Sequence, residues 1–129
     1  MATVIIGLRE VIADLTVAES GLLPEVEAIL GKGANNIKVG AKRRVSGLPR
    51  GYARAYPASI SYDVFMVPGS VRAEIGPDKQ RKQGALGNLI ELGSVHNSPI
   101  PHLSPALDDE APRFEAALAT VLPALLGQP

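Results

Sequence analysis

An alternation of apolar and polar residues on either side of a Pro-Gly pair constrains the fold of this 129-residue chain more than any other feature. Apolar residues occupy every second position from 60 to 66 and again from 71 to 75. A period of two is typical of strands that bury one face. Pro68 and Gly69, between the two runs, suit the second and third positions of a type II turn. The sequence therefore predicts an antiparallel hairpin over about 59–76.

A helix is predicted before the hairpin, with Pro24 in its first turn, where the missing N–H is not needed. Gly31, Gly33 and Gly40 interrupt this helix, and each costs about 1 kcal/mol in a helix interior. Its second half is therefore expected either to fray or to use the glycines for the close approach of another backbone. The apolar face consists of Val26, Ile29, Leu30, Gly33, Ile37, Gly40 and Ala41.

Two more helices are predicted after the hairpin. A short one begins near Leu86 and ends at Gly93. The last helix is expected to be capped by Ser104, with Pro105 as its first residue. Pro112 removes a hydrogen bond from that helix, so we expect a kink or a restart near Asp109. The apolar face of the last helix is Phe114, Leu118, Val121, Leu122 and Leu125.

The N-terminal residues complete the predicted fold. Val4–Ile6 is typical of a short strand, and the spacing from Leu8 to about Ala18 indicates a helix; a single helix from Thr3 is the alternative. The fold class is therefore α+β, as a single domain over residues 1–129. A small antiparallel sheet, made of the hairpin and the N-terminal strand, packs against two or three helices. Because the chain has no Trp and only two Phe, its core is aliphatic and thin for a monomer.

Two segments are predicted to be mobile loops, residues 45–58 and 78–84. Both are rich in Gly, Pro or basic residues, and we expect them to become ordered only on docking to a neighbour. The second segment is the predicted docking loop, and its basic residues are Lys79, Arg81 and Lys82.

Charge is balanced overall but segregated along the chain. The formal net charge is zero, yet residues 32–54 carry seven basic residues and no acid. This segment is predicted to face either a neighbouring subunit or passing DNA, because Lys and Arg neutralise phosphates. A DNA-binding accessory protein is the alternative function. The basic residues are Lys32, Lys38, Lys42, Arg43, Arg44, Arg50 and Arg54.

Catalytic chemistry has little support in the sequence. There is no cysteine, and His96 and His102 are the only histidines, at a spacing that fits no zinc or calcium motif. An enzyme centred on these histidines is the third hypothesis, and we predict instead a non-enzyme without metal or cofactor. Arg9, Glu10 and Asp14 interrupt the N-terminal apolar residues, so we expect a soluble chain with no secretory leader and no membrane contact.

A motif in the second half resembles a signature of bacteriophage proteins. It runs from Ile90 to Ser94 and, after a polar spacer, from Pro99 to Leu107. The pattern is similar to that of the neck and tail-completion family of long-tailed phages, typified by the gene-product-ten tail component of a lambda-like phage. Leu92 and His102 stand where that family usually has aromatic residues. The signature residues are Glu91, Gly93, Ser94, Pro101, Pro105, Ala106 and Leu107.

The resemblance implies a structural subunit of the head-to-tail connector, as a neck, tail-completion or tail-terminator protein in the virion. It implies a homo-oligomer, with a hexameric ring around double-stranded DNA whose sequence it does not read. Its other partners would be neighbouring connector proteins of the stopper or adaptor type and tail tube or terminator proteins. The signature residues would then contribute to subunit packing.

Overall fold

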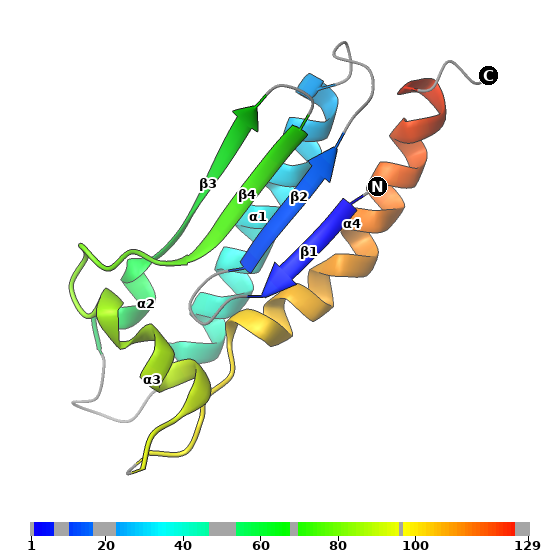
Figure 1. Cartoon of the computed structure of the whole chain (residues 1–129). Helices are drawn as coiled ribbons and strands as arrows, with labels where there is room; N and C mark the ends of the chain where they lie inside the picture. The colour runs from blue at the N-terminus through cyan, green and yellow to red at the C-terminus, as the bar shows by residue number, and fades with distance from the viewer. Residues whose placement is uncertain are drawn as a thin grey trace.

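Four antiparallel strands form one sheet in this computed structural model, in the order β1-β2-β4-β3 (Figure 1). The strands are β1 (Ala2–Ile6), β2 (Val11–Thr16), β3 (Ile60–Val67) and β4 (Ser70–Pro77). The helices are α1 (Leu23–Val45), α2 (Tyr56–Ser59), α3 (Gly87–Leu92) and α4 (Leu103–Leu125), with a 3-10 turn at Gly84–Leu86. The structure describes residues 2–6, 11–16, 23–46, 54–67, 70–95 and 97–125. The predicted α+β class is confirmed.

The predicted hairpin is β3 and β4. Their register places Tyr62 opposite Ile75 and Val67 opposite Ser70, which leaves a two-residue connection. Val71, Ala73 and Ile75 of β4 are fully buried, and the intervening Arg72 is exposed. The two connecting residues, 68 and 69, lie outside the described part of the chain, and the type II turn stays a prediction.

The helix predicted from Leu8 to about Ala18 is wrong, because this part of the chain contains β2. Residues 11, 12 and 15 fit a helical period, but 11, 13 and 15 fit a strand equally well. In the sheet, Val11 and Leu15 lie opposite Ile75 and Val71, and β2 pairs with β1 on its other side. Two ladders of hydrogen bonds outweigh the weak local preference of a short apolar run.

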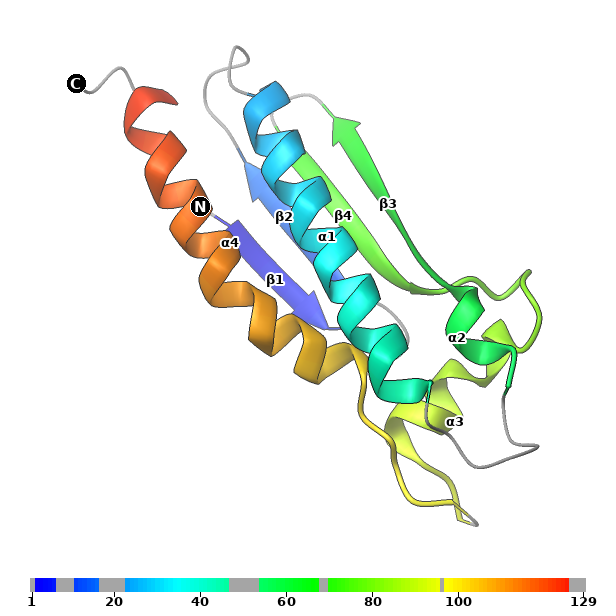
Figure 2. The same cartoon turned by 180° about the vertical axis from the view of Figure 1, so that it is seen from behind.

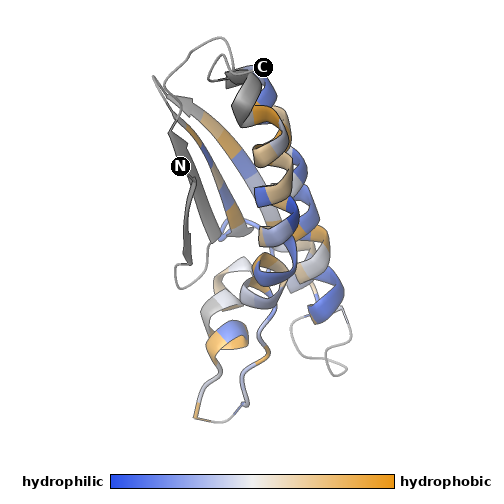
Figure 3. Ribbon diagram, turned by 90° about the vertical axis from the view of Figure 1, so that its right-hand side faces the viewer, coloured by the Kyte–Doolittle hydropathy of each residue, from blue (hydrophilic) through white to orange (hydrophobic). Residues whose placement is uncertain are grey.

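Both long helices cover one face of the sheet and lie side by side (Figures 1 and 2). Figure 3 shows the two layers from the side, with none of the described helices over the other face of the sheet. An antiparallel sheet can carry one solvated face, provided that its other face is buried. The buried apolar residues lie between the layers and include Val26, Leu30, Ile37, Ile60, Val71, Ile75, Leu107 and Phe114.

The glycines of α1 permit a close helix contact. A Cβ at Gly40 would lie 3.3 Å from Ala106 Cβ of α4, and one at Gly33 would lie 3.6 Å from the Phe114 ring. The helix continues unbroken to Val45, so close approach, and not fraying, is the correct alternative.

Helix α4 differs from the prediction at its start and in its middle. It begins at Leu103, one residue before the expected cap Ser104. The Glu91 carboxylate, and not the Ser104 hydroxyl, accepts the capping hydrogen bonds, one of which the Ser104 backbone N–H donates. No restart occurs near Asp109, because α4 is a single helix through the exposed Pro112. Its axis turns between the gold and the red parts of the ribbon in Figure 1, as expected where a proline leaves a carbonyl without a partner.

Residues 54–58 were expected to be part of an irregular loop, but the short helix α2 begins at Tyr56 and ends at Ser59, where the hairpin was expected to start. In the segment 78–84, the backbone N–H of Arg81 donates to the Asp78 carbonyl oxygen, and that of Gly84 donates to the Arg81 carbonyl oxygen. Gly84 is buried. A Cβ at Gly84 would overlap the Asp78 carbonyl, so the turn closes tightly around this position. The mobility of both loops stays a prediction. No described helix is both long enough and apolar enough to span a bilayer.

Candidate functional site

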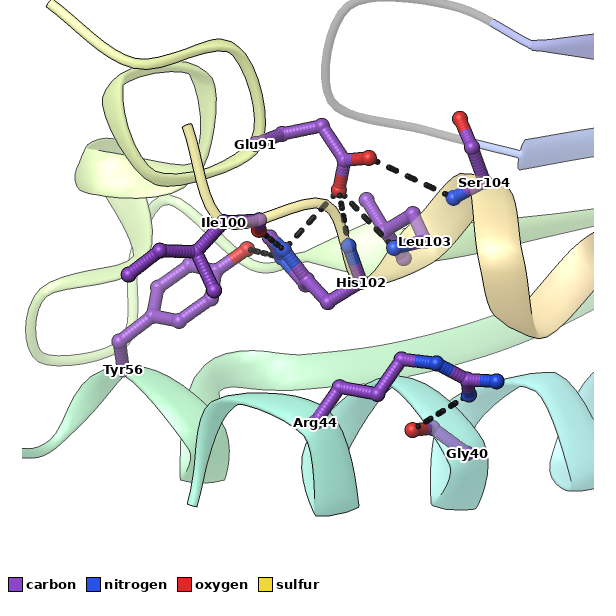
Figure 4. Close-up of polar contacts among 8 residues, drawn as sticks. All are labelled: Gly40, Arg44, Tyr56, Glu91, Ile100, His102, Leu103 and Ser104. Atoms are coloured by element: carbon purple, nitrogen blue, oxygen red, sulfur yellow. Dashed lines mark hydrogen bonds and ion pairs between the residues drawn. The ribbon is translucent and has the colours of Figure 1, made fainter. Parts of the chain in front are cut away.

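The strongest polar cluster in the described chain is a buried contact between α2 and the start of α4. The Tyr56 hydroxyl lies 2.6 Å from His102 Nε2, with the two rings edge to face at 5.3 Å (Figure 4). Neither side chain has any solvent exposure. A buried tyrosine hydroxyl requires a hydrogen-bond partner, and the imidazole supplies it.

Glu91, on α3, completes this cluster from the opposite side. Its Oε1 accepts hydrogen bonds from the backbone N–H of His102 and Leu103 at 3.1 and 2.9 Å, and Oε2 accepts from Ser104 N–H at 3.5 Å. These groups belong to the first turn of α4, where backbone donors have no partner inside the helix. The carboxylate therefore caps α4 from a separate helix and lies at the positive end of its dipole.

The ring of His102 joins these two contacts. Its Nδ1 lies 2.9 Å from Glu91 Oε1 and 2.8 Å from the Ile100 carbonyl oxygen, so this nitrogen carries a proton. In the neutral imidazole, Nε2 then accepts the hydroxyl proton of Tyr56. One side chain thus connects α2, α3 and α4, and every hydrogen-bonding atom of the ring is used.

The pKa of Glu91 is lowered to about 2. Burial raises this pKa, but hydrogen bonds from the His102 side chain and from the backbone N–H groups of Leu103 and His102 outweigh burial, and electrostatic attraction to the His102 ring adds to them. Glu91 is therefore ionised throughout the physiological range. It is a stable anion at the base of α4.

This cluster has no opening for a substrate. Tyr56 and His102 are fully buried and Glu91 is 8% exposed, so a reacting molecule cannot reach the imidazole or the carboxylate without local unfolding. What the arrangement does chemically is fasten three helices together. His96 lies outside the described residues, so its distance from His102 is not defined.

Metal ligands do not gather in the described part of the chain, where no group of three His, Asp or Glu side chains could hold an ion. Asp108 and Asp109 are exposed on α4, whereas Glu91 is buried, and Asp109 pairs with Arg44 of α1.

The structure divides the predicted basic segment between two flanks of α1. Lys38 lies over the Tyr62 ring of β3, 5.3 Å from its centre, and Lys42 follows one helical turn later. Arg43 and Arg44 line a groove of about 180 Å³ between α1 and α4. Lys32 lies one turn before Asn36, which donates to Glu110 of α4.

The groove between α1 and α4 is of mixed charge. Arg44 bonds to Asp109 and to the Gly40 carbonyl, and Arg113 lies 3.7 Å from Glu110. Arg43 has no hydrogen bond or ion pair among the described residues. Of the remaining predicted basic residues, Arg54 is exposed in a turn and Arg50 lies outside the described part of the chain.

Most of the signature residues have distinct structural roles within the chain. Glu91 caps α4, Ala106 and Leu107 are buried in the core, and Gly93 has a positive φ of 79° after α3. A Cβ at Gly93 would meet the Pro99 nitrogen at 2.7 Å, so only glycine fits.

The other signature residues lie nearer the surface. Ser94 and Asn97 exchange backbone hydrogen bonds, Pro101 is exposed and Pro105 is half-buried. In the predicted docking loop, Lys79, Arg81 and Lys82 are all exposed. Packing of either set against a neighbouring subunit stays a prediction.

Sequence reasoning missed Tyr56, which lay in a segment expected to be irregular. The available signal was the aromatic residue next to Pro57, but its partner is 46 positions away. Comparison of the chain with protein-family models, curated proteins and solved structures finds no match.

Proposed function

We propose that this chain is a non-enzymatic subunit of the phage head-to-tail connector, a neck, tail-completion or tail-terminator protein that forms a ring around the DNA channel. One observation carries the proposal: the residues that match the family signature occupy positions with separate and exacting physical roles. Glu91 caps α4, Gly93 allows a turn that no other residue fits, and Ala106 packs against Gly40 of α1, where a Cβ would lie 3.3 Å from Ala106 Cβ.

The architecture gives further support. Helices cover one face of the sheet only (Figure 3), and within the described strands β1 and β3 each pair on one side alone. A sheet with an open face and two edges has surfaces on which neighbouring copies can pack. The sealed Glu91 and His102 side chains favour a structural role over catalysis.

The experiment is to determine the assembly state and the location of the protein. Native mass spectrometry of the purified chain should give closed oligomers, with the hexamer dominant, and electron microscopy should show rings with a central opening. Labelled protein should be found at the junction of head and tail in particles of the phage that encodes it. A chain that is absent from the particles contradicts the proposal.

A further inference from the structure

Helix α3 and the loop that follows it lie at the end of the molecule opposite to the last turns of α4 (Figures 1 and 3). We call the exposed apolar residues of this segment, Leu89 and Leu92 of α3 and Val95 of the loop, the apolar tip. These side chains are 48%, 56% and 97% exposed. From residue 83 to residue 107 the only charged side chain is Glu91, which is buried. The tip therefore offers apolar surface with no charge to desolvate on contact.

The tip is held in shape before any partner binds. Ser94 and Asn97 exchange backbone hydrogen bonds at 2.8 and 3.3 Å, and Ile100 N–H donates to the Ile90 carbonyl at 2.7 Å. The positive φ of Gly93 redirects the chain after α3. Docking of a preformed loop costs less conformational entropy than docking of a flexible one, so the tip is suited to binding.

A cationic turn lies at the same end of the molecule. Lys79 and Lys82 are exposed, and neither has a hydrogen bond or ion pair among the described residues. Arg81 in the same turn is held by the Ala58 carbonyl and by Asp78. This turn is followed directly by the 3-10 turn and α3, so the two lysines carry unpaired positive charge just before the helix that bears the apolar tip. A partner should therefore combine an apolar surface with acids.

The outer face of α4 has that combination. Pro112, Ala116 and Ala119 are exposed and recur at helical spacing on the side opposite the buried Phe114 and Leu118. Asp108 and Glu115 lie along one border of this stripe, exposed and without a hydrogen bond or ion pair among the described residues. Small side chains leave room for the leucines and the valine of a tip, and the acids complement its lysines.

We infer that the apolar tip of one copy docks on the outer face of α4 of the next copy. The contact joins two different surfaces, so each copy uses its tip on one neighbour and its α4 on the other. Such a head-to-tail contact generates a ring when the rotation closes. The inference rests on the proposed function, for which it names the contact that builds the ring.

Cysteine cross-linking tests the contact directly, because the natural chain has no cysteine. The variants Val95→Cys and Ala116→Cys are prepared separately, mixed, and treated with a short bismaleimide. The mixture should give covalent dimers in large excess over either variant alone, since only tip-to-α4 neighbours bring the two thiols together. The matched control replaces Ala116→Cys by Lys32→Cys, an exposed position on α1, and should give dimers at background level.

Two substitutions, at apolar positions of nearly equal exposure, test whether association depends on the tip or on any exposed apolar residue. Leu92→Asp should lower the association constant about tenfold or more, measured by sedimentation velocity. Val39→Asp, at a position 50% exposed on α1, should leave it within about twofold. Circular dichroism checks that both variants keep the fold. Equal effects of the two changes would overturn the inference.

A charge exchange tests the acidic border. The double variant Lys79→Glu, Lys82→Glu should weaken association several-fold, and adding Asp108→Lys and Glu115→Lys to the same chain should restore it. If the wild-type chain forms oligomers but the mixed Val95→Cys and Ala116→Cys variants give no cross-link, or if the charge exchange gives no rescue, the contact is overturned and the ring proposal stands. A purified chain that is monomeric but is found in virus particles also overturns the contact and leaves the ring proposal standing. Absence from particles contradicts the proposed function itself.

Discussion

Glu91 shows how one side chain can decide the start of an element that lies elsewhere in the chain. Its carboxylate accepts hydrogen bonds from three backbone N–H groups of the α4 N-terminus and from the His102 ring. Each bond to a charged acceptor is stronger than a neutral one, and the acceptor is almost fully buried. Position 91 therefore requires a side chain that is negatively charged and of a length that reaches the first turn of α4.

Replacement of Glu91 by Gln should lower the free energy of unfolding by about 1–3 kcal/mol, because an amide carries no charge and turns an NH2 group toward backbone donors. Urea denaturation measures the change. Glu115→Gln is the matched control on α4, the helix that Glu91 caps, since the Glu115 side chain is exposed, and it should change stability by less than about 0.5 kcal/mol. Equal losses would show that the buried cap contributes nothing.

The stability of the protein should depend on acid pH through the same carboxylate. Its pKa falls from an ordinary value of 4.5 to about 2 in the folded chain, so the unfolded chain takes up the proton first as the pH falls. The contribution, on the order of 3 kcal/mol, is complete above about pH 4.5 and is lost as the pH falls toward 2. The difference in unfolding free energy between wild type and Glu91→Gln should therefore narrow across this range, and a constant difference would contradict the assignment.

Tyr56→Phe should destabilise the chain by about 1–3 kcal/mol, because it leaves His102 Nε2 buried without the donor that lies 2.6 Å away. Thermal and urea unfolding give the value. Tyr62→Phe is the control, since the half-buried Tyr62 hydroxyl has no hydrogen bond among the described residues, and its ring keeps the contact with Lys38. A loss at Tyr62 as large as that at Tyr56 would count against the role of the imidazole.

At the scale of the elements, α1 and α4 pack closely because their facing residues are small. Gly40 and Ala106 form the closest point, and Gly33 faces the Phe114 ring. The low helix propensity of glycine is thus offset by a contact that a larger residue would prevent. Gly31 has no such neighbour, since a Cβ there would meet nothing within 4 Å.

Substitution of Gly31 and of Gly40 should accordingly change the stability of the chain in opposite directions. Gly31→Ala should stabilise the chain by about 0.5–1 kcal/mol through helix propensity alone. Gly40→Leu should destabilise it by about 1–3 kcal/mol, because Ala106 Cβ lies 3.3 Å and Arg44 Nη1 lies 3.1 Å from the Cβ position. Chemical denaturation of both variants checks the pair, and a stabilising Gly40→Leu would refute the close contact.

At the scale of the whole molecule, the basic segment does not form one continuous surface. Lys38 lies on the β3 side of α1, and Arg43 lines the groove with α4 on the other side. Arg44, in the same groove, is occupied by Asp109. A single straight duplex therefore does not contact all the described cations of this segment at once, and the connector and DNA-binding hypotheses predict different salt dependence.

Duplex binding by the isolated chain should be weak and only mildly dependent on salt. Contact by about three cations predicts a slope of roughly −3 for the logarithm of the binding constant against that of the salt concentration. Fluorescence anisotropy with labelled duplex measures this slope. Arg43→Ala should make the slope less steep by about one unit, to roughly −2. Lys38→Ala, on the other flank of α1, should leave the slope unchanged. A slope near −6 would favour the DNA-binding alternative.

The amino-acid sequence by itself determined the hairpin of β3 and β4, the two long helices and the apolar face of α1. Each of these has a long run of one period, or a turn residue at a defined position, and such signals act between near neighbours in the chain. The signature from Ile90 to Leu107 was visible for the same reason, because its residues lie close together in sequence.

Tertiary structure alone decided the strand state of residues 11–16, the cap of α4 and the contact of Tyr56 with His102. The apolar pattern of 11–16 fits two periods, and pairing with β4, more than 50 positions later, selects the strand. Glu91 reaches donors 11 to 13 positions away, and Tyr56 meets an imidazole 46 positions away. Hydrogen bonds over such separations have no local signal, because the packing of α1 and α4 on the sheet brings the groups together.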